Sequence, residues 1–180
     1  MRRELHGAPD YEGSVKAAFD DLLIRIVRFV SMRLEAARSR YPYLNKISAS
    51  NGPKEIDLQN DLFDYLGSTG YTAWERDNVA SGRTDIVVPM GPFSFVIETK
   101  QDDAQWHEGS SAVFVAQATA YQQTDVRLGI LAVLDLSVRR PGDPHLDGCF
   151  SVKTDRYSMS DERTVVLVRV PGNKRTPSDQ

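Results

Sequence analysis

Two acidic residues and a lysine lie at the ends of apolar segments of this chain. Glu98, Thr99 and Lys100 follow the run Phe93-Ser-Phe-Val-Ile, and Asp85 precedes the run Ile-Val-Val. A carboxylate on a buried segment is costly unless it is paired or binds a metal ion. Two acids and a lysine that converge from adjacent strands therefore form a suitable site for a hard cation and a phosphate group.

The chemistry that these residue types support is hydrolysis of a phosphodiester. Mg²⁺, or Mn²⁺ in its place, prefers oxygen ligands, and Asp85 and Glu98 are the expected carboxylates. Because strand side chains alternate, Lys100 shares a face with Glu98, where its ammonium can orient the attacking water or stabilise transition-state charge. Two alternatives stay open. Asp85 could cap a turn at a strand end, and Glu98 with Lys100 could be a surface ion pair.

The order of these residues resembles the PD-(D/E)xK nuclease superfamily. Asp85 corresponds to the aspartate of the family, Glu98-Thr99-Lys100 corresponds to the (D/E)-x-K element, and Thr84 stands where the name has proline. The likeness runs from about residue 54 to about residue 135. It implies a restriction-endonuclease-like fold, in which helices flank a mixed β-sheet core.

Two further elements carry the same resemblance. Glu55 begins a helix at the point where many members have an additional acid, and Gln117 with Tyr121 resembles the QxxxY element of the RecB-type branch. In the family, the backbone carbonyl that corresponds to Thr99 adds a metal ligand. The resemblance thus implies a metal set of Glu55, Asp85, Glu98 and Thr99, and a catalytic set of Asp85, Glu98, Lys100, Gln117 and Tyr121.

The elements that must position these residues follow from hydrophobic periodicity and from Gly and Pro punctuation. Short turns between the first three strands favour antiparallel pairing. A helix before the fourth strand favours a right-handed crossover to a parallel neighbour. The fold class is therefore α/β with a mixed sheet. Helices are expected over residues 14–38, 53–66 and 111–123, and strands over 71–78, 83–89, 93–100, 126–136, 150–157 and 164–170.

The expected helix over 14–38 is long and amphipathic, with Phe19, Leu22, Ile26 and Phe29 on its apolar face. That face packs on its own domain or, alternatively, on a second copy or a partner subunit. The chain divides into a polar segment with this helix (1–41), a nuclease-like domain (42–171) and a disordered tail (172–180). Residues 1–12 read as loosely ordered. Asp102 and Asp103 read as solvated or, alternatively, as residues that add affinity for a cation.

Net charge, the single cysteine and the length of the apolar runs indicate which kinds of protein this chain can be. A formal net charge of −3 does not favour a broad electrostatic footprint for nucleic acid, but a local basic patch can coexist with it. Cys149 is the single cysteine, so no internal disulfide and no zinc spacing are available. No apolar run reaches the length of a membrane span, and the N-terminus lacks a signal-peptide core, so a soluble cytoplasmic protein is expected.

These observations favour a Mg²⁺- or Mn²⁺-dependent nuclease that acts on DNA rather than RNA. The resemblance associates such small proteins with restriction, anti-phage defence or repair. The alternative is a nucleic-acid-binding or scaffolding module that has the nuclease fold and little activity and is docked in a larger assembly. A metal-dependence assay separates the two hypotheses.

Overall fold

The fold is given by a computed structural model, which describes residues 2–37, 39–45, 52–76, 85–102, 115, 118, 126–137, 145–158 and 161–172. The helices are α1 (Arg2–Leu5), α2 (Gly13–Glu35) and α3 (Glu55–Ser68), with short 3₁₀ turns η1 (Pro42–Asn45) and η2 (Leu146–Cys149). The strands are β1 (Trp74–Arg76), β2 (Asp85–Met90), β3 (Phe93–Asp102), β4 (Leu128–Asp135), β5 (Phe150–Ser158) and β6 (Asp161–Pro171). The predicted α/β class is confirmed.

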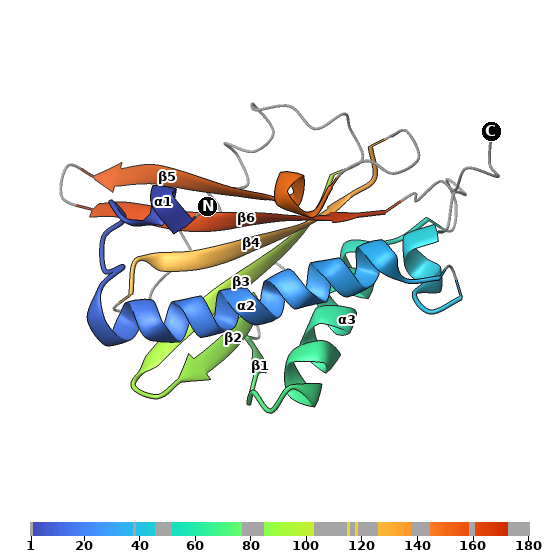
Figure 1. The fold of residues 1–180 in the computed structure, drawn as a ribbon, viewed down its shortest axis with the longest axis horizontal. Coiled ribbons are helices and arrows are strands. Elements are labelled where there is room, and N and C mark those ends of the chain that lie inside the picture. Colours follow the sequence, from blue (N-terminus) through green and yellow to red (C-terminus); the bar gives the residue numbers. More distant parts are fainter. Residues whose placement is uncertain are drawn as a thin grey trace.

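The strands form a single mixed sheet with the order β1-β2-β3-β4-β6-β5 (Figure 1). The three strands β1, β2 and β3 pair antiparallel, β3 pairs parallel with β4, β4 pairs parallel with β6, and β6 pairs antiparallel with β5. The predicted antiparallel pairing of the first three strands and the predicted parallel pairing of β3 with β4 are thus confirmed. Strand β3 lies where the antiparallel half of the sheet meets the parallel half.

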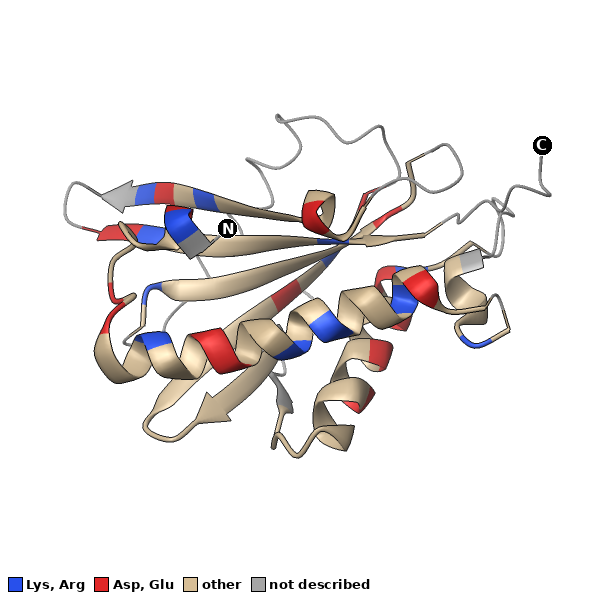
Figure 2. Cartoon of the chain, viewed as in Figure 1, with Lys and Arg blue, Asp and Glu red and all other residues tan. Residues whose placement is uncertain are grey.

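Strand β4 shows why the centre of the sheet forms from this sequence. All of its residues are buried, and its sequence is apolar apart from the last residue, Asp135. Central strands of parallel sheets are covered on both faces and are therefore continuous apolar runs. Figure 2 shows that charged residues are spread along α2 and α3, whereas β4 is uncharged over most of its length.

Helix α2 lies across one face of this sheet (Figure 1). Its residues Phe19, Leu22, Ile26 and Phe29 are at most 1% exposed. They belong to the same apolar cluster as the sheet residues, and the ring centroids of Phe19 and Phe95 are 5.1 Å apart. The expectation that this face packs on its own chain is confirmed, so the face is not available to a second copy or a partner.

An Ile26→Asp substitution tests this packing. It places a carboxylate at a fully buried position, so the free energy of unfolding should fall by at least about 3 kcal/mol. Ile24→Asp is the matched control, because Ile24 is 45% exposed on the same helix. It should change stability by less than about 0.5 kcal/mol. Thermal melting of both variants is the measurement, and equal melting temperatures would contradict the observed orientation of α2.

The N-terminal residues differ from the expectation of loose order. Residues Arg2–Leu5 form α1, and Leu5 and Tyr11 are buried. The carboxylate of Asp10 accepts bonds from Arg127 Nε (3.0 Å), Nη2 (2.8 Å) and the backbone N–H (2.8 Å), which hold the Asp10 pKa below its usual value. The prediction of loose order for residues 1–12 was therefore wrong. Leu5 and Tyr11 are isolated apolar residues, and Asp10 pairs with Arg127 far along the sequence, so no hydrophobic period marks this segment.

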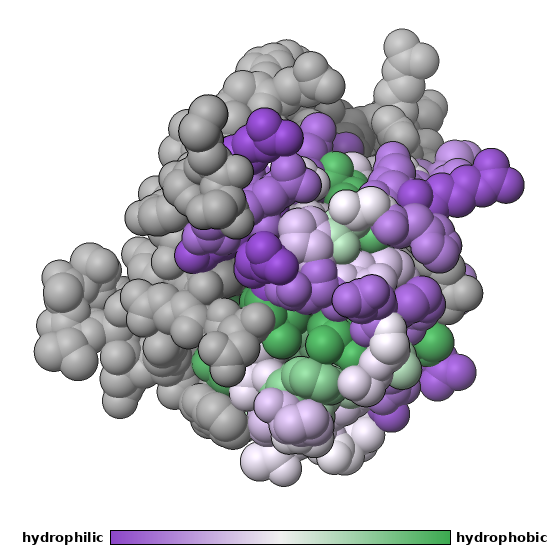
Figure 3. Space-filling model, turned by 90° about the vertical axis from the view of Figure 1, so that its left-hand side faces the viewer, coloured by the Kyte–Doolittle hydropathy of each residue, from purple (hydrophilic) through white to green (hydrophobic). Residues whose placement is uncertain are grey.

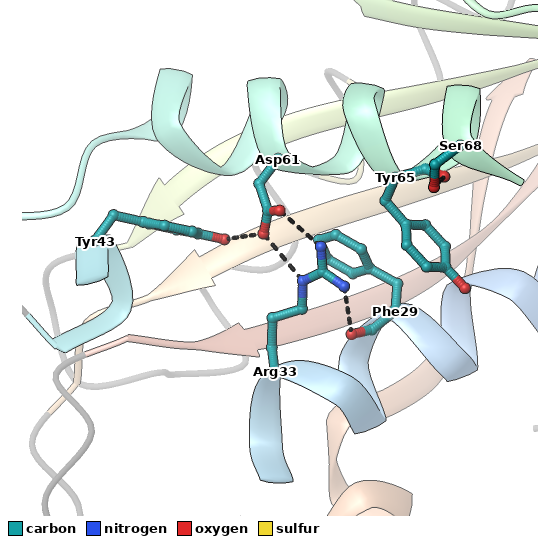
Figure 4. A network of polar contacts seen from close by, with 6 residues as sticks. All are labelled: Phe29, Arg33, Tyr43, Asp61, Tyr65 and Ser68. Carbon is teal, nitrogen blue, oxygen red and sulfur yellow. Dashed lines mark hydrogen bonds and ion pairs between the residues drawn. The ribbon is translucent and has the colours of Figure 1, made fainter. Parts of the chain in front are cut away.

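A polar cluster joins α2 to α3 (Figure 4). Arg33 is 3% exposed and donates from Nε (3.0 Å) and Nη2 (2.6 Å) to the carboxylate of Asp61. Tyr43 donates its hydroxyl to the same carboxylate at 2.8 Å, and burial raises its pKa far above the usual range, so it keeps its proton. The guanidinium also lies over the rings of Phe29 and Tyr65. This cluster fixes the middle of α3 relative to α2.

The other face of the sheet carries a smaller apolar cluster, made of Val115, Ala118, Leu131, Val133, Val165 and Leu167. Val115 and Ala118 are helical, whereas the other residues of the expected helix 111–123 lie outside the described residues.

Figure 3 views the molecule from the end where α2 begins. Apolar side chains occupy the middle of this surface, and hydrophilic residues lie above them. In the part of the chain that the structure describes, no helix is long and apolar enough to cross a membrane.

Candidate functional site

Strand β3 presents Glu98 and Lys100 on the face of the smaller apolar cluster. The register pairs Glu98 with Leu131 and Lys100 with Val133, both members of that cluster. The ammonium of Lys100 contacts Glu98 Oε1. The side chain of Glu98 is 3% exposed and that of Lys100 is 19% exposed, so this is a buried pair and not the surface ion pair left open as an alternative.

Glu55 reaches the same lysine from α3. Its Oε1 lies 3.9 Å from Lys100 Nζ, and its side chain is 7% exposed. The described ladder between β2 and β3 ends at the pair Ile86–Ile97, so the part of β3 from Glu98 onward extends beyond it. The structure therefore brings Glu55, Glu98 and Lys100 together, from a helix and a strand far apart in the sequence.

One oxygen of this cluster has an unusual environment. Glu98 Oε2 is buried and accepts no hydrogen bond from any residue that the structure describes. Burial of an unsatisfied carboxylate oxygen costs free energy, and the cost is offset when the oxygen binds a proton donor or a cation. Glu98 is thus suited to hold a cation through Oε2 while Oε1 contacts Lys100.

Asp85 is the second expected carboxylate. It is the first residue of β2, and its backbone pairs with Arg76 of β1. The register that pairs Ile86 with Ile97, continued by one residue, sets the backbone of Asp85 beside that of Glu98. The side chain of Asp85 lies outside the described residues. Among the side chains that are described, no three His, Cys, Asp or Glu residues form a metal-binding group.

The remaining predicted residues have different outcomes. Thr99 is buried, 3% exposed, and its register partner Ala132 belongs to the larger cluster on the opposite face, as the alternation predicts. Its carbonyl as a metal ligand stays a prediction. Gln117 and Tyr121 lie outside the described residues, so their roles also stay predictions.

The sequence reasoning missed a second polar group at the carboxyl ends of the parallel strands. Asp135 is completely buried and accepts bonds from Arg169 Nε (2.8 Å) and Nη2 (2.6 Å), and from the hydroxyl of Ser137 (2.6 Å). Asp102 is 5% exposed and is paired in register with Asp135, so the expectation that it is solvated was wrong. A signal was present for Asp135, which ends the apolar run of β4, and polar residues are common at the carboxyl ends of strands in α/β sheets. Asp102 follows the polar residues Lys100 and Gln101, so no such signal marked it.

The register also relates these two groups. Lys100, Val133 and Arg169 are neighbours across β3, β4 and β6, so the lysine and the arginine stand on one face. Adjacent strands are about 4.8 Å apart, and β4 lies between β3 and β6, so the backbones of Lys100 and Arg169 are separated by about 10 Å. The ammonium of Lys100 is held by the buried Glu98, and the guanidinium of Arg169 is held by the buried Asp135. Both positive side chains therefore lie at the carboxyl ends of the parallel strands.

Comparisons of the chain with protein-family models, with curated proteins and with solved structures found no match. The assignment of function consequently depends on the residues and their arrangement.

Proposed function

We propose that this protein is a metal-dependent nuclease that hydrolyses phosphodiester bonds, with DNA as its substrate. The observation that carries the proposal is the buried Glu98, whose Oε1 contacts Lys100 and whose Oε2 accepts no hydrogen bond from the described residues. A cation at Oε2 would offset the cost of burying this carboxylate. The resemblance of Asp85, Glu98 and Lys100 to the PD-(D/E)xK elements supports the same reading, and with it a role in restriction, anti-phage defence or repair.

The residues fit a hard divalent cation. Carboxylate and carbonyl oxygens are the ligands that Mg²⁺ and Mn²⁺ prefer, and Glu98, Asp85, Glu55 and the carbonyl of Thr99 are the proposed donors. When bound, the cation supplies Lewis-acid polarisation of the phosphate and a lower pKa for water. The site lies beside apolar Leu131 and Val133, which keep the local dielectric low and strengthen electrostatic interactions there.

Lys100 has a role distinct from that of the carboxylates. In hydrolysis a water oxygen bonds to phosphorus, the bond from phosphorus to the leaving sugar oxygen breaks, and that oxygen takes up a proton. The ammonium of Lys100 can donate hydrogen bonds to the water or to a non-bridging phosphate oxygen, where negative charge accumulates. Its contacts with Glu98 and Glu55 hold it at the site, so less ordering is required when substrate binds.

The test is a cleavage assay with four substrates: supercoiled plasmid, linear duplex DNA, single-stranded DNA and RNA. Each is incubated with the protein in Mg²⁺, in Mn²⁺ or in EDTA. We expect cleavage of at least one DNA substrate in Mg²⁺ or Mn²⁺, no cleavage in EDTA, and little cleavage of RNA. Binding of DNA without cleavage in any metal would favour the scaffolding alternative, and cleavage that persists in EDTA would exclude the proposed metal role.

A further inference from the structure

The first backbone N–H of α3 is bound by a side chain from strand β3. Glu55 N–H donates to Gln101 Oε1 at 3.0 Å. The first N–H groups of a helix have no partner within the helix, and a side-chain oxygen at the preceding N-cap position commonly satisfies one of them. Here the N-cap residue is Lys54, whose ammonium has no acceptor atom. Gln101 therefore supplies from a neighbouring strand the acceptor that the helix lacks.

This hydrogen bond ties α3 to the residue that follows Lys100. Strand alternation places Lys100 and Gln101 on opposite faces of β3, so the two side chains approach the start of α3 from either side of the strand. Gln101 accepts a hydrogen bond from the backbone N–H of Glu55 at 3.0 Å, and Lys100 Nζ lies 3.9 Å from the Glu55 carboxylate. Both the position and the direction of the Glu55 carboxylate are thereby fixed relative to the β3 site residues.

The tether lies where α3 is least constrained by packing. The leucines that bury α3 are Leu58, Leu62 and Leu66, which begin almost a full turn after Glu55. The Asp57 carboxylate accepts a hydrogen bond from the Lys54 N–H, and the Asp57 N–H donates to the Lys54 carbonyl, whereas the Glu55 N–H donates to Gln101. Helix ends fray, so an acceptor for this N–H group steadies the first turn. Since Glu55 belongs to that first turn, the hydrogen bond that its backbone N–H donates to Gln101 helps to hold its carboxylate at the site.

We infer that Gln101 is a positioning residue of the site: it sets Glu55 in reach of the cation and of Lys100 without touching either the cation or the substrate. The inference rests on the proposed function, because it assigns Glu55 a place in the metal site. Outer contacts of this kind commonly change metal affinity or activity by about ten- to a hundredfold.

The experiment uses the full chain with Gln101→Met, which keeps the length of the side chain and removes its carbonyl, and Gln101→Glu, which restores an oxygen acceptor. Amide hydrogen exchange of Glu55 and calorimetric Mn²⁺ titration are the two readouts. Gln101→Met is expected to speed the exchange of the Glu55 amide and to weaken Mn²⁺ binding by about tenfold. Gln101→Glu is expected to return the exchange to the wild-type rate.

A double-mutant cycle with Glu55→Gln tests whether Gln101 acts through Glu55. In the Glu55→Gln background, Gln101→Met should change Mn²⁺ affinity by less than about twofold, because the effects of coupled residues are not additive. An equal loss of affinity in both backgrounds, or wild-type exchange and affinity in Gln101→Met, would overturn the inference while the proposed function stands. A wild-type protein that binds no Mn²⁺ and cleaves no nucleic acid would overturn both.

Discussion

Glu98→Gln is expected to lower the rate of metal-dependent DNA cleavage by about a thousandfold while the protein stays folded. The substitution keeps the shape of the side chain and removes the charge that would hold the cation. The substitution weakens the buried contact with Lys100, which keeps the Glu55 carboxylate at 3.9 Å as a partner, so stability should fall without unfolding the protein. Cleavage rates at saturating Mg²⁺, with a thermal melt beside them, are the measurement.

The matched control for Glu98→Gln is Glu162→Gln. Glu162 pairs with Arg156 in an exposed ion pair at the other edge of the sheet, so the same chemical change there should leave the rate unchanged. Asp85→Ala should reproduce the loss seen for Glu98, because the two are the proposed carboxylate ligands. Wild-type cleavage by either site variant would show that the site is assigned to the wrong residues.

Lys100→Met is expected to separate rate from metal affinity. Cleavage should slow by about a hundredfold or more, because the ammonium is assigned to the water and the transition state. Mn²⁺ affinity should be unchanged or up to about fivefold tighter, since a positive charge that contacts Glu98 and lies 3.9 Å from Glu55 is gone. Metal affinity is measured by calorimetry and the rate by single-turnover cleavage.

Lys153→Met is the control for this second prediction, because Lys153 lies on β5, away from β3 in the order of the sheet. It should alter neither quantity. A normal rate in Lys100→Met would remove the lysine from the mechanism. A loss of rate that matched an equal loss of Mn²⁺ affinity would instead make Lys100 a structural support for the carboxylates.

Local patterns predicted most of the elements, because burial imposes a period on them. The apolar stripe of α2, the leucine face of α3 and the continuous apolar run of β4 each show which side of the element is buried, so the type of each element could be predicted from its sequence. The ends of strands were less well predicted. Strand β3 continues past Lys100 to Asp102, since pairing with β4 extends to Asp135 and gives polar residues a place in the ladder.

The candidate site was predictable only in part, for a related reason. Glu98 and Lys100 are two residues apart on one strand, so alternation alone places them on one face. The contact between Glu55 and Gln101 joins residues that are 46 positions apart, and that between Asp135 and Arg169 joins residues 34 apart. Neither has a local period, so both depend on the packing of α3 and on the order of strands.

The position of α2 has a consequence for the synthesis of the protein. This helix is synthesised before β3 and β6, yet its buried residues pack against both strands. Until β6 has left the ribosome, Phe19, Leu22 and Ile26 have no completed sheet to cover. Uncovered apolar surface makes a nascent chain prone to aggregation. Production of the folded protein should therefore depend on how well this one helix is shielded while the rest of the chain is translated.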